Sequence, residues 1–354
     1  MSNLYITADV VGLESGGGKV TFHESQALKE MGPCEVWGRE QLQDQHGVFE
    51  PEPWNFDVKA SYDLDVRKGY KICHVYAGTF SSTIRKLKMM GCKVTYTAAA
   101  HDVQKSRQAH EELGVPYDYP HLTDPALWER YLGGYKAADV LICPSQHSAA
   151  VMRGFGCTNR IEVIPHGCSY VDKIHPLPER FTVGVLGAIG GPDKGLVYLL
   201  RAWKKLDYSD AVLVLGGSHS NTQWVHALLQ HVGYPRNVVL TGWVDNVSDF
   251  YNSISLLVQP SITEGFGIEI LEAMMHGRLA LTSTGAGGVD VAVDSFPAAD
   301  VVALASKIDS YKKDISALAK AGLRSRAVAE GLTWDKVRQK YVSLWRSMLN
   351  DGIP

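Results

Sequence analysis

Residues 260–290 are the stretch that most constrains how this chain can fold. An apolar run typical of a buried strand ends just before it, and the chain then turns through Gly265 and Gly267. Apolar residues next recur at helical spacing, which predicts strand, glycine turn and helix in direct succession. The amides of Phe266, Gly267 and Ile268 would point out of the helix N-terminus toward an anion. The turn therefore predicts a phosphate-binding site.

The rest of the chain alternates short apolar runs with helical patterns. This alternation indicates parallel sheets built from strand, helix and strand units. A length of 354 residues is sufficient for two domains, each with its own core. Residues 165–178 contain three prolines and are the predicted interdomain linker.

Two carboxylates frame the glycine turn. Glu264 precedes the helix and Glu272 lies within it, with seven residues between them. They lie about two helical turns apart, so they can reach different parts of one ligand. Together with the lead-in P-S-x-x-E-G-F-G, the pair resembles the signature of the retaining, nucleotide-sugar-dependent glycosyltransferases of family 4. The alternative is that both are solvated acids near a helix N-terminus.

The resemblance extends over almost the whole chain and implies the GT-B fold, with two Rossmann-like, doubly wound α/β domains facing across a cleft. It implies an acceptor-binding domain at residues 1–170 and a nucleotide-sugar-binding domain at 171–333. A C-terminal helix, residues 334–354, would pack back on the first domain. In the donor site, the resemblance implies that Glu264 holds sugar hydroxyls, the helix amides hold the diphosphate and Glu272 holds the ribose.

Other donor-site residues are also implied by resemblance. Lys194 occupies the position of the family's diphosphate-binding lysine. The family often has an arginine directly after the glycine corresponding to Gly187, whereas this chain has Ala188, so one cation fewer is expected. The motif T-G-W-V-D resembles the family's base-binding loop, in which backbone groups around Val244 would contact the base.

Two candidate sites belong to the first half of the chain. His101 follows three alanines at the end of a predicted strand, where ligands bind in open α/β sheets. It resembles the family's strand-end histidine, which contacts the donor sugar near its reacting carbon, although a single histidine is often structural. Gly17 and Gly18 lie in a glycine-rich turn that lacks nucleotide-triphosphatase spacing. By resemblance they approach the donor phosphate; the alternative is a plain turn.

Composition limits the partners. The net charge of −3 gives no electrostatic reason to expect nucleic acid. The six cysteines contain no C-x-x-C pair and are expected to be free thiols of a reducing compartment. The N-terminus enters a strand without a leader pattern, and the chain has no run of 18 apolar residues. We therefore expect a cytoplasmic protein.

The resemblance implies an acceptor that offers a hydroxyl group, on a sugar, a lipid-linked compound or another molecule. Its contacts are expected in residues 41–71 and 115–123, which contain no motif that indicates the acceptor. Residues 41–71 have poor periodicity and are expected to form a surface excursion. Arg85, Lys86 and Lys88 lie on a predicted helix. They are candidates for peripheral membrane contact, and the alternative is a solvated face above a core stripe.

The expected reaction moves a hexose from a UDP- or GDP-sugar to this acceptor. The diphosphate is a stable leaving anion, so it needs stabilisation of its charge and no protonation. Lys194 and the helix amides would supply that stabilisation without a metal or other cofactor. We expect retention of the anomeric configuration, with the acceptor attacking from the leaving-group face. One alternative is a nucleotide-sugar epimerase or hydrolase of the same fold. Another is a non-catalytic nucleotide-sugar-binding subunit, which Ala188 favours. An NAD-dependent oxidoreductase is the last alternative, because no G-x-G-x-x-G motif follows a strand in this chain.

Overall fold

The computed structural model describes residues 2–9, 11–13, 15–39, 53–78, 80–100, 102–117 and 124–350. Internal contacts divide the chain into two units. Unit 1 comprises residues 1–100, 118–166 and 334–354, and unit 2 comprises residues 101–117 and 167–333. Residues 101–117 thus belong to the second unit, a difference from the domain limits expected from the sequence, and residues 334–354 belong to the first.

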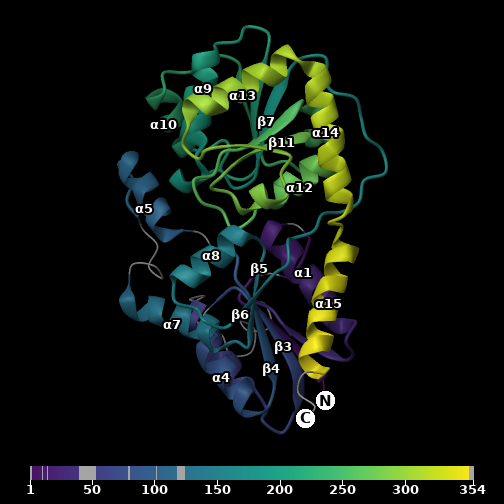
Figure 1. Ribbon diagram of the computed structural model, residues 1–354. Helices are drawn as coiled ribbons and strands as arrows, with labels where there is room; N and C mark the ends of the chain where they lie inside the picture. The colour runs from purple at the N-terminus through teal and green to yellow at the C-terminus, as the bar shows by residue number, and fades with distance from the viewer. Residues whose placement is uncertain are drawn as a thin grey trace. The chain divides into compact units, whose positions relative to one another are not determined.

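Unit 1 is a parallel sheet with helices on both faces (Figure 1). Its described strands have the order β2-β1-β3-β4-β5-β6, and each neighbouring pair is parallel. The strands are β1 (Ser2–Thr7), β2 (Cys34–Trp37), β3 (Tyr70–Tyr76), β4 (Lys93–Thr97), β5 (Val140–Cys143) and β6 (Arg160–Val163). The helices are α1 (Gly16–Lys29), α3 (Pro53–Asp63), α4 (Ser81–Met89), α7 (Pro125–Ala137), α8 (Gln146–Gly154) and α15 (Trp334–Asn350).

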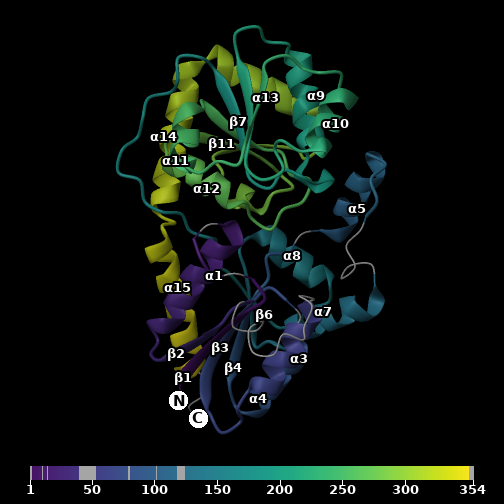
Figure 2. The same ribbon diagram turned by 180° about the vertical axis from the view of Figure 1, so that it is seen from behind.

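The two faces of this sheet differ in chemistry. Successive residues of a strand point to opposite faces. On β1, Leu4 and Ile6 join an apolar core that includes residues of α3, α4 and α7. Tyr5 points to the other face, where α1 and α15 pack side by side (Figures 1 and 2). The layer between these two helices and the sheet is polar at its centre.

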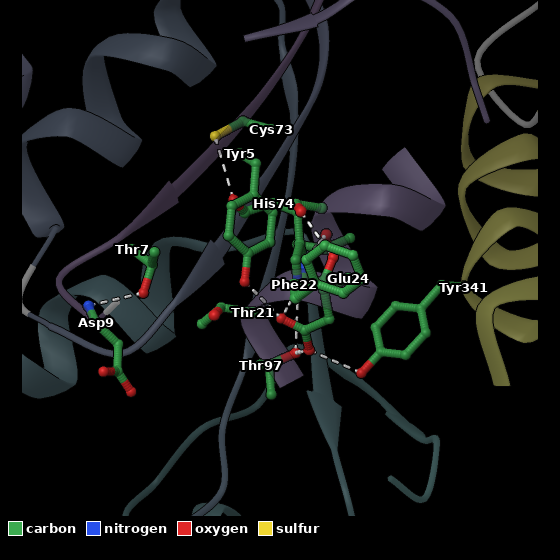
Figure 3. Close-up of polar contacts among 12 residues, drawn as sticks. Tyr5, Thr7, Asp9, Thr21, Phe22, Glu24, Cys73, His74, Thr97 and Tyr341 are labelled. Carbon is green, nitrogen blue, oxygen red and sulfur yellow. Dashed lines mark hydrogen bonds and ion pairs between the residues drawn. The ribbon is translucent and has the colours of Figure 1, made fainter. Parts of the chain in front are cut away.

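A buried carboxylate, Glu24 of α1, organises this polar layer (Figure 3). Its Oε2 atom accepts a hydrogen bond from the Tyr5 hydroxyl (2.9 Å) and lies 3.1 Å from Nε2 of His74. Its Oε1 atom accepts hydrogen bonds from the hydroxyls of Thr97 (2.7 Å) and Tyr341 (2.9 Å). Four donors match the hydrogen-bonding capacity of an ionised carboxylate. The network therefore joins α1, three strands and the C-terminal helix.

Glu24 stays ionised in this setting. Burial would raise the pKa of Glu24, but His74 and the hydrogen bonds from Thr97 and Tyr341 outweigh burial and hold the pKa below its ordinary value. The neighbouring hydroxyl of Thr95 contacts His74 Nδ1 at 2.7 Å. A buried charge with all of its hydrogen bonds made is stable in place, whereas removing a partner leaves a costly unpaired group.

Unit 2 is a second parallel sheet, with the order β12-β11-β10-β7-β8-β9 in the described residues. Its strands are β7 (Thr182–Leu186), β8 (Val212–Gly216), β9 (Val238–Gly242), β10 (Leu256–Gln259), β11 (Leu279–Ser283) and β12 (Asp294–Phe296). Its helices are α5 (Val103–Glu112), α9 (Leu196–Leu206), α10 (Gln223–His231), α11 (Val247–Ser253), α12 (Ile268–Met275), α13 (Val301–Lys313) and α14 (Ile315–Glu330), with the short 3-10 helices η1 (Pro192–Lys194) and η2 (Gly287–Asp290).

Both faces of the unit 2 sheet are apolar, as is typical of parallel sheets covered by helices on each side. On β10, Leu256 and Val258 join one core, together with residues of α9, α10 and α13. Leu257 joins a second core formed with α11 and α12. Both units are therefore doubly wound, Rossmann-like α/β domains, and the predicted fold class is confirmed.

One expectation about unit 1 is wrong. Within residues 41–71, which were expected to be an irregular surface excursion, residues 53–63 form α3. Phe56 and Ala60, one helical turn apart, are buried in the unit 1 core. Asp57 is also buried and accepts a hydrogen bond from the Thr83 amide (2.8 Å) in the first turn of α4. The polar residue that weakened the sequence pattern thus stabilises the start of a neighbouring helix.

We predict that Glu24→Gln lowers the free energy of unfolding by about 2–4 kcal/mol, because the introduced amide donors face hydroxyl donors. Glu30→Gln is the matched control. Glu30 is exposed at the end of the same helix, and its ion pair with Arg338 (3.4 Å) should contribute less than about 1 kcal/mol. Urea unfolding followed by circular dichroism measures both effects. Equal midpoints for the two variants would contradict a stabilising role for the network.

Candidate active site

The candidate site lies at the carboxyl edge of the unit 2 sheet. The strand order reverses between β10 and β7, which are hydrogen-bonded neighbours at the centre of the sheet. Loops leaving two such strands diverge to opposite faces, and ligands of open α/β sheets bind at this position. Residues 187–195 follow β7, and residues 260–267 follow β10.

Backbone contacts hold the two loops together. Gly195 has a φ of +66°, and a Cβ atom there would overlap the carbonyl oxygen of Pro260. The amide of Ile262 donates a hydrogen bond to the carbonyl of Asp193 (2.7 Å). A glycine is therefore required at position 195 for both conformation and space. The contact brings η1, with Lys194 at its end, against the loop that carries Glu264.

Lys194 and Glu264 form an ion pair through Nζ and Oε2. Their side chains are 27% and 21% exposed, so the pair is largely withdrawn from water yet open on one side. Burial would lower the pKa of Lys194, but the charges of Glu264 and Glu269 outweigh burial and raise the pKa. Lys194 is thus a permanent cation across the physiological pH range.

The chain around Glu264 is fixed by the glycine-rich loop at residues 284–290. The Glu264 amide donates to the carbonyl of Gly285 (3.0 Å), and the Gly287 amide donates to the carbonyl of Glu264 (2.9 Å). The Gly288 amide donates to the carbonyl of Phe266 (2.7 Å). These contacts form a short parallel pairing beside the start of α12.

Helix α12 begins directly after Gly267, which has a φ of +91°. Gly267 is the N-cap residue and has no side chain with which to cap the helix. The first-turn amides, including that of Ile268, carry the partial positive charge of a helix N-terminus. Phe266, Gly267 and Ile268 therefore lie where the predicted turn passes into the helix, two to four residues after Glu264.

Glu272 lies further along α12 and has separate partners. The hydroxyl of the buried Tyr251 donates a hydrogen bond to Oε2 of Glu272 (2.9 Å). Burial, together with the charge of Glu272, raises the pKa of Tyr251 well above its ordinary value, so the hydroxyl remains a donor. The two predicted glutamates thus have different environments, one paired with a lysine and the other oriented by a tyrosine.

A third carboxylate, Glu269, belongs to the same edge and was missed in the sequence. It lies in the first turn of α12, and its Oε1 atom is 3.6 Å from the position of a Cβ atom at Gly187. Burial, followed by the charge of Glu264, raises the pKa of Glu269 from 4.5 to about 7 despite the charge of Lys194. The signal available in the sequence is helical spacing, which aligns Glu269 with Glu272 three residues later.

The remaining predicted residues belong to other segments of the chain. Val244 follows β9, is half-buried and packs against the Gly216 backbone region and the second core of unit 2. Gly17 and Gly18 lie in the first turn of α1 in unit 1, where the Ser15 hydroxyl accepts a hydrogen bond from the Gly18 amide (3.0 Å). A Cβ atom at Gly17 would overlap the Asp9 carboxylate. His101 lies outside the described residues.

The basic residues of α4 are partly engaged within unit 1. The Lys86 ammonium donates to the carbonyl of Ser61 (2.6 Å), and Lys88 forms an ion pair with Asp139 (2.9 Å). Arg85 is exposed.

In the described part of the chain, no helix combines the length and apolar character needed to span a bilayer. The same residues contain no group of three or more His, Cys, Asp or Glu side chains arranged to hold a metal ion.

Comparison with known proteins finds a family similar to most of the second unit. Residues 180–314, which contain Lys194, Glu264 and Glu272, match the family described as glycosyl transferases group 1. This segment is therefore similar to glycosyltransferase group 1 domains.

Two relatives match parts of the chain. The chain is 36% identical over 101 residues to an uncharacterized glycosyltransferase of Methanocaldococcus jannaschii, covering 28% of this chain and 26% of that protein. It is 26% identical over 205 residues to the capsular polysaccharide biosynthesis glycosyltransferase CapM of Staphylococcus aureus, covering 53% and 54% respectively. The chain thus spans about a quarter and about half of the lengths of these relatives.

Solved structures with the same fold extend over nearly the whole chain. Sucrose-phosphate synthase from Thermosynechococcus elongatus has a TM-score of 0.77 and 16% identity, covering 99% of this chain and 100% of that one. HepE of Anabaena, solved in complex with UDP-glucose, has a TM-score of 0.70 and 15% identity, covering 98% and 100%. At these identities the likeness is one of fold, namely the two-domain GT-B fold.

Substitution of Gly195 by alanine should disrupt the site through its backbone. We expect Gly195→Ala to lower the free energy of unfolding by about 3 kcal/mol or more, because left-handed strain adds to overlap with Pro260. Gly114→Ala is the matched control, since Gly114 has a φ of +63° and open space around its Cβ position. The control should cost about 1 kcal/mol. Thermal unfolding measures both variants, and equal losses would show that the loop contact is unimportant.

The pKa of Glu269 predicts a pH-dependent stability. An acid whose folded pKa is about 7, above its unfolded value of 4.5, binds more protons when folded, so its contribution is present below the unfolded pKa and is lost as pH rises through 7. Glu269→Gln should therefore gain stability relative to the wild type as the pH rises. The difference in unfolding free energy between variant and wild type should increase by about 1–3 kcal/mol from pH 4.5 to pH 8. Chemical unfolding at both pH values tests this. A pH-independent difference would contradict the shift.

Proposed function

We propose that this protein is a retaining glycosyltransferase that moves a hexose from a UDP- or GDP-sugar to a hydroxyl acceptor. The observation that carries the proposal is the Lys194–Glu264 pair beside the N-terminus of α12, inside the segment that matches the glycosyl transferases group 1 family. A cation and helix amides can hold a diphosphate, and a neighbouring carboxylate can hold sugar hydroxyls. The solved complexes of HepE with UDP and with UDP-glucose support a nucleotide-sugar donor.

Each residue has a proposed role in donor binding. Lys194 and the amides of Phe266, Gly267 and Ile268 bind the diphosphate, and Glu264 binds the transferred sugar. Glu272, oriented by the tyrosine hydroxyl, binds the two ribose hydroxyls as an acceptor of hydrogen bonds.

Other positions complete the proposal by resemblance. Backbone groups around Val244 contact the base. His101 contacts the sugar near its reacting carbon, and Gly17 and Gly18 approach the donor phosphate. If the acceptor is lipid-linked, the exposed face of α4 around Arg85 is the proposed membrane contact.

The proposed chemistry stabilises a leaving anion. The bond between the anomeric carbon and the diphosphate oxygen breaks while the acceptor oxygen bonds to the same carbon on the same face. The acceptor proton passes to the departing phosphate oxygen, so the charge balances without a separate base. Lys194 and the helix amides stabilise the developing negative charge, which is the role of a preorganised electrostatic site. This arrangement supports transfer without a metal ion.

A second candidate is a non-catalytic nucleotide-sugar-binding subunit. Ala188 is exposed directly after Gly187, where the resembled family often has an arginine. Loss of that cation lowers the stabilisation available to a leaving diphosphate while leaving the base and ribose contacts in place. Donor turnover by the isolated chain separates this candidate from the transferase.

We predict slow nucleotide release from one member of a panel of UDP-, GDP- and ADP-sugars by the purified chain with EDTA present. Lys194→Ala and Glu264→Gln should each lower this rate by about 100-fold or more, because each removes an interaction with the reacting donor. Lys205→Ala removes an exposed cation from α9 and should match the wild type. Coupled nucleotide detection measures the rates.

Two outcomes would contradict the proposal in different ways. If one donor raises the melting temperature but none is turned over with any acceptor, the binding subunit is supported. If a product forms, NMR of its anomeric proton tests the stereochemistry, and an inverted anomer would exclude the retaining mechanism.

A further inference from the structure

Glu269 introduces a negative charge at the place proposed for the donor diphosphate. Its Oε1 atom lies 3.6 Å from the Cβ position at Gly187 and 3.5 Å from that at Gly267. Gly187 begins the loop that ends with Lys194, and Gly267 precedes the amides of α12. The carboxylate is therefore flanked by both of the backbone segments that would surround the phosphates.

The charges around Glu269 do not favour a second anion. From the loop at residues 260–267, Glu264 raises the pKa of Glu269, and from α12 itself Glu272 raises it further. From η1, Lys194 lowers it, and Asp193 lies beside that lysine. One lysine thus faces several carboxylates at this edge. A diphosphate adds about two negative charges more, which favours the protonated form of any nearby carboxyl group.

The imidazole of His219 is another titratable group at this edge. It follows β8 with a φ of +68°, and its Cγ atom lies 2.7 Å from the position of a Cβ atom at Gly190. The loop after β8 is joined to the loop after β7 by the Ile189 amide, which donates to the Ser218 carbonyl (3.4 Å). A pH dependence of donor binding must therefore be assigned by comparing these two side chains.

We propose that Glu269 makes donor binding proton-linked, so that the protein takes up a proton from solvent on this carboxylate when the diphosphate enters the site. The inference rests on the proposed function, because it concerns the same donor site. Protonation removes the repulsion and converts the side chain into a hydrogen-bond donor toward a phosphate oxygen. Glu269 then acts as a positioning residue for the diphosphate at low pH and opposes donor binding at high pH.

The size of the effect follows from linkage. Because the pKa of Glu269 is about 7 before binding, the group is largely protonated at pH 6 and largely ionised at pH 8. If only the protonated form accepts the donor well, the dissociation constant rises by up to about tenfold between pH 6.5 and pH 8. Proton uptake then approaches one proton per donor at the higher pH.

Isothermal titration calorimetry with UDP-glucose tests the inference. If UDP-glucose does not bind, the titration uses the nucleotide sugar from the panel that does. This donor is suitable because its diphosphate carries a constant charge between pH 6 and pH 9. Titrations at pH 6.5 and pH 8, in two buffers of different ionisation enthalpy and with EDTA present, give both the affinity and the protons taken up. The wild type should bind up to about tenfold more weakly at pH 8. Glu269→Gln should bind equally at both pH values, without proton uptake.

Two control variants assign the effect. Glu179→Gln removes an exposed carboxylate of the same unit and should keep the wild-type pH dependence. His219→Gln should also keep it. If His219→Gln abolishes the dependence while Glu269→Gln retains it, the inference is wrong.

Other results separate the inference from the proposed function. Tight donor binding with no pH dependence in the wild type would overturn the inference alone. If no nucleotide sugar binds at any pH, the proposed function fails and the inference fails with it.

Discussion

The approach of Gly195 to the Pro260 carbonyl is the contact on which the candidate site depends. Reversal of strand order between β10 and β7 sends their loops toward opposite faces, so the loops meet only where their backbones come close. At this contact there is no room for a side chain, and the adjacent hydrogen bond from Ile262 to Asp193 fixes η1. The pairing of Lys194 with Glu264 follows from this backbone arrangement and would not survive a shift of either loop.

The two units stabilise their sheets by different means. Unit 2 places apolar residues on both faces, and its helices pack through non-directional contacts. In unit 1, two hydrogen bonds hold α15 in place. The Tyr341 hydroxyl donates to Glu24 of α1, and the Trp345 indole donates to the hydroxyl of Thr95 in β4 (3.0 Å). Apolar contacts tolerate sliding of a helix, whereas buried hydrogen bonds require one register. The polar layer therefore specifies where this C-terminal helix packs within unit 1.

Much of the fold could be predicted from the sequence, because buried parallel strands appear as short apolar runs and helices as a distinct period. The geometry around Glu264 was also predictable, since glycine, strand and helix signals coincide there. The grouping of residues 101–117 with unit 2 was not. It depends on contacts distant in sequence, such as the ion pair of Glu112 with Arg201 (3.0 Å) and its hydrogen bond from Tyr198. Neither local period nor motif spacing contains that information.

Charge explains why a motif can predict geometry without predicting affinity. The backbone amides at the start of α12 are present in any sequence that forms this turn, and the lysine and paired glutamates match the resembled family. Ala188, where the resembled family often has an arginine, leaves the site with one cation fewer, and Glu269 adds a carboxylate to the same edge. Anion binding must then depend more on the amides and Lys194, and the balance changes with the ionisation of a single carboxyl group whose pKa is about 7. Donor affinity in this chain is consequently a property of the electrostatic environment of the motif, in addition to the motif itself.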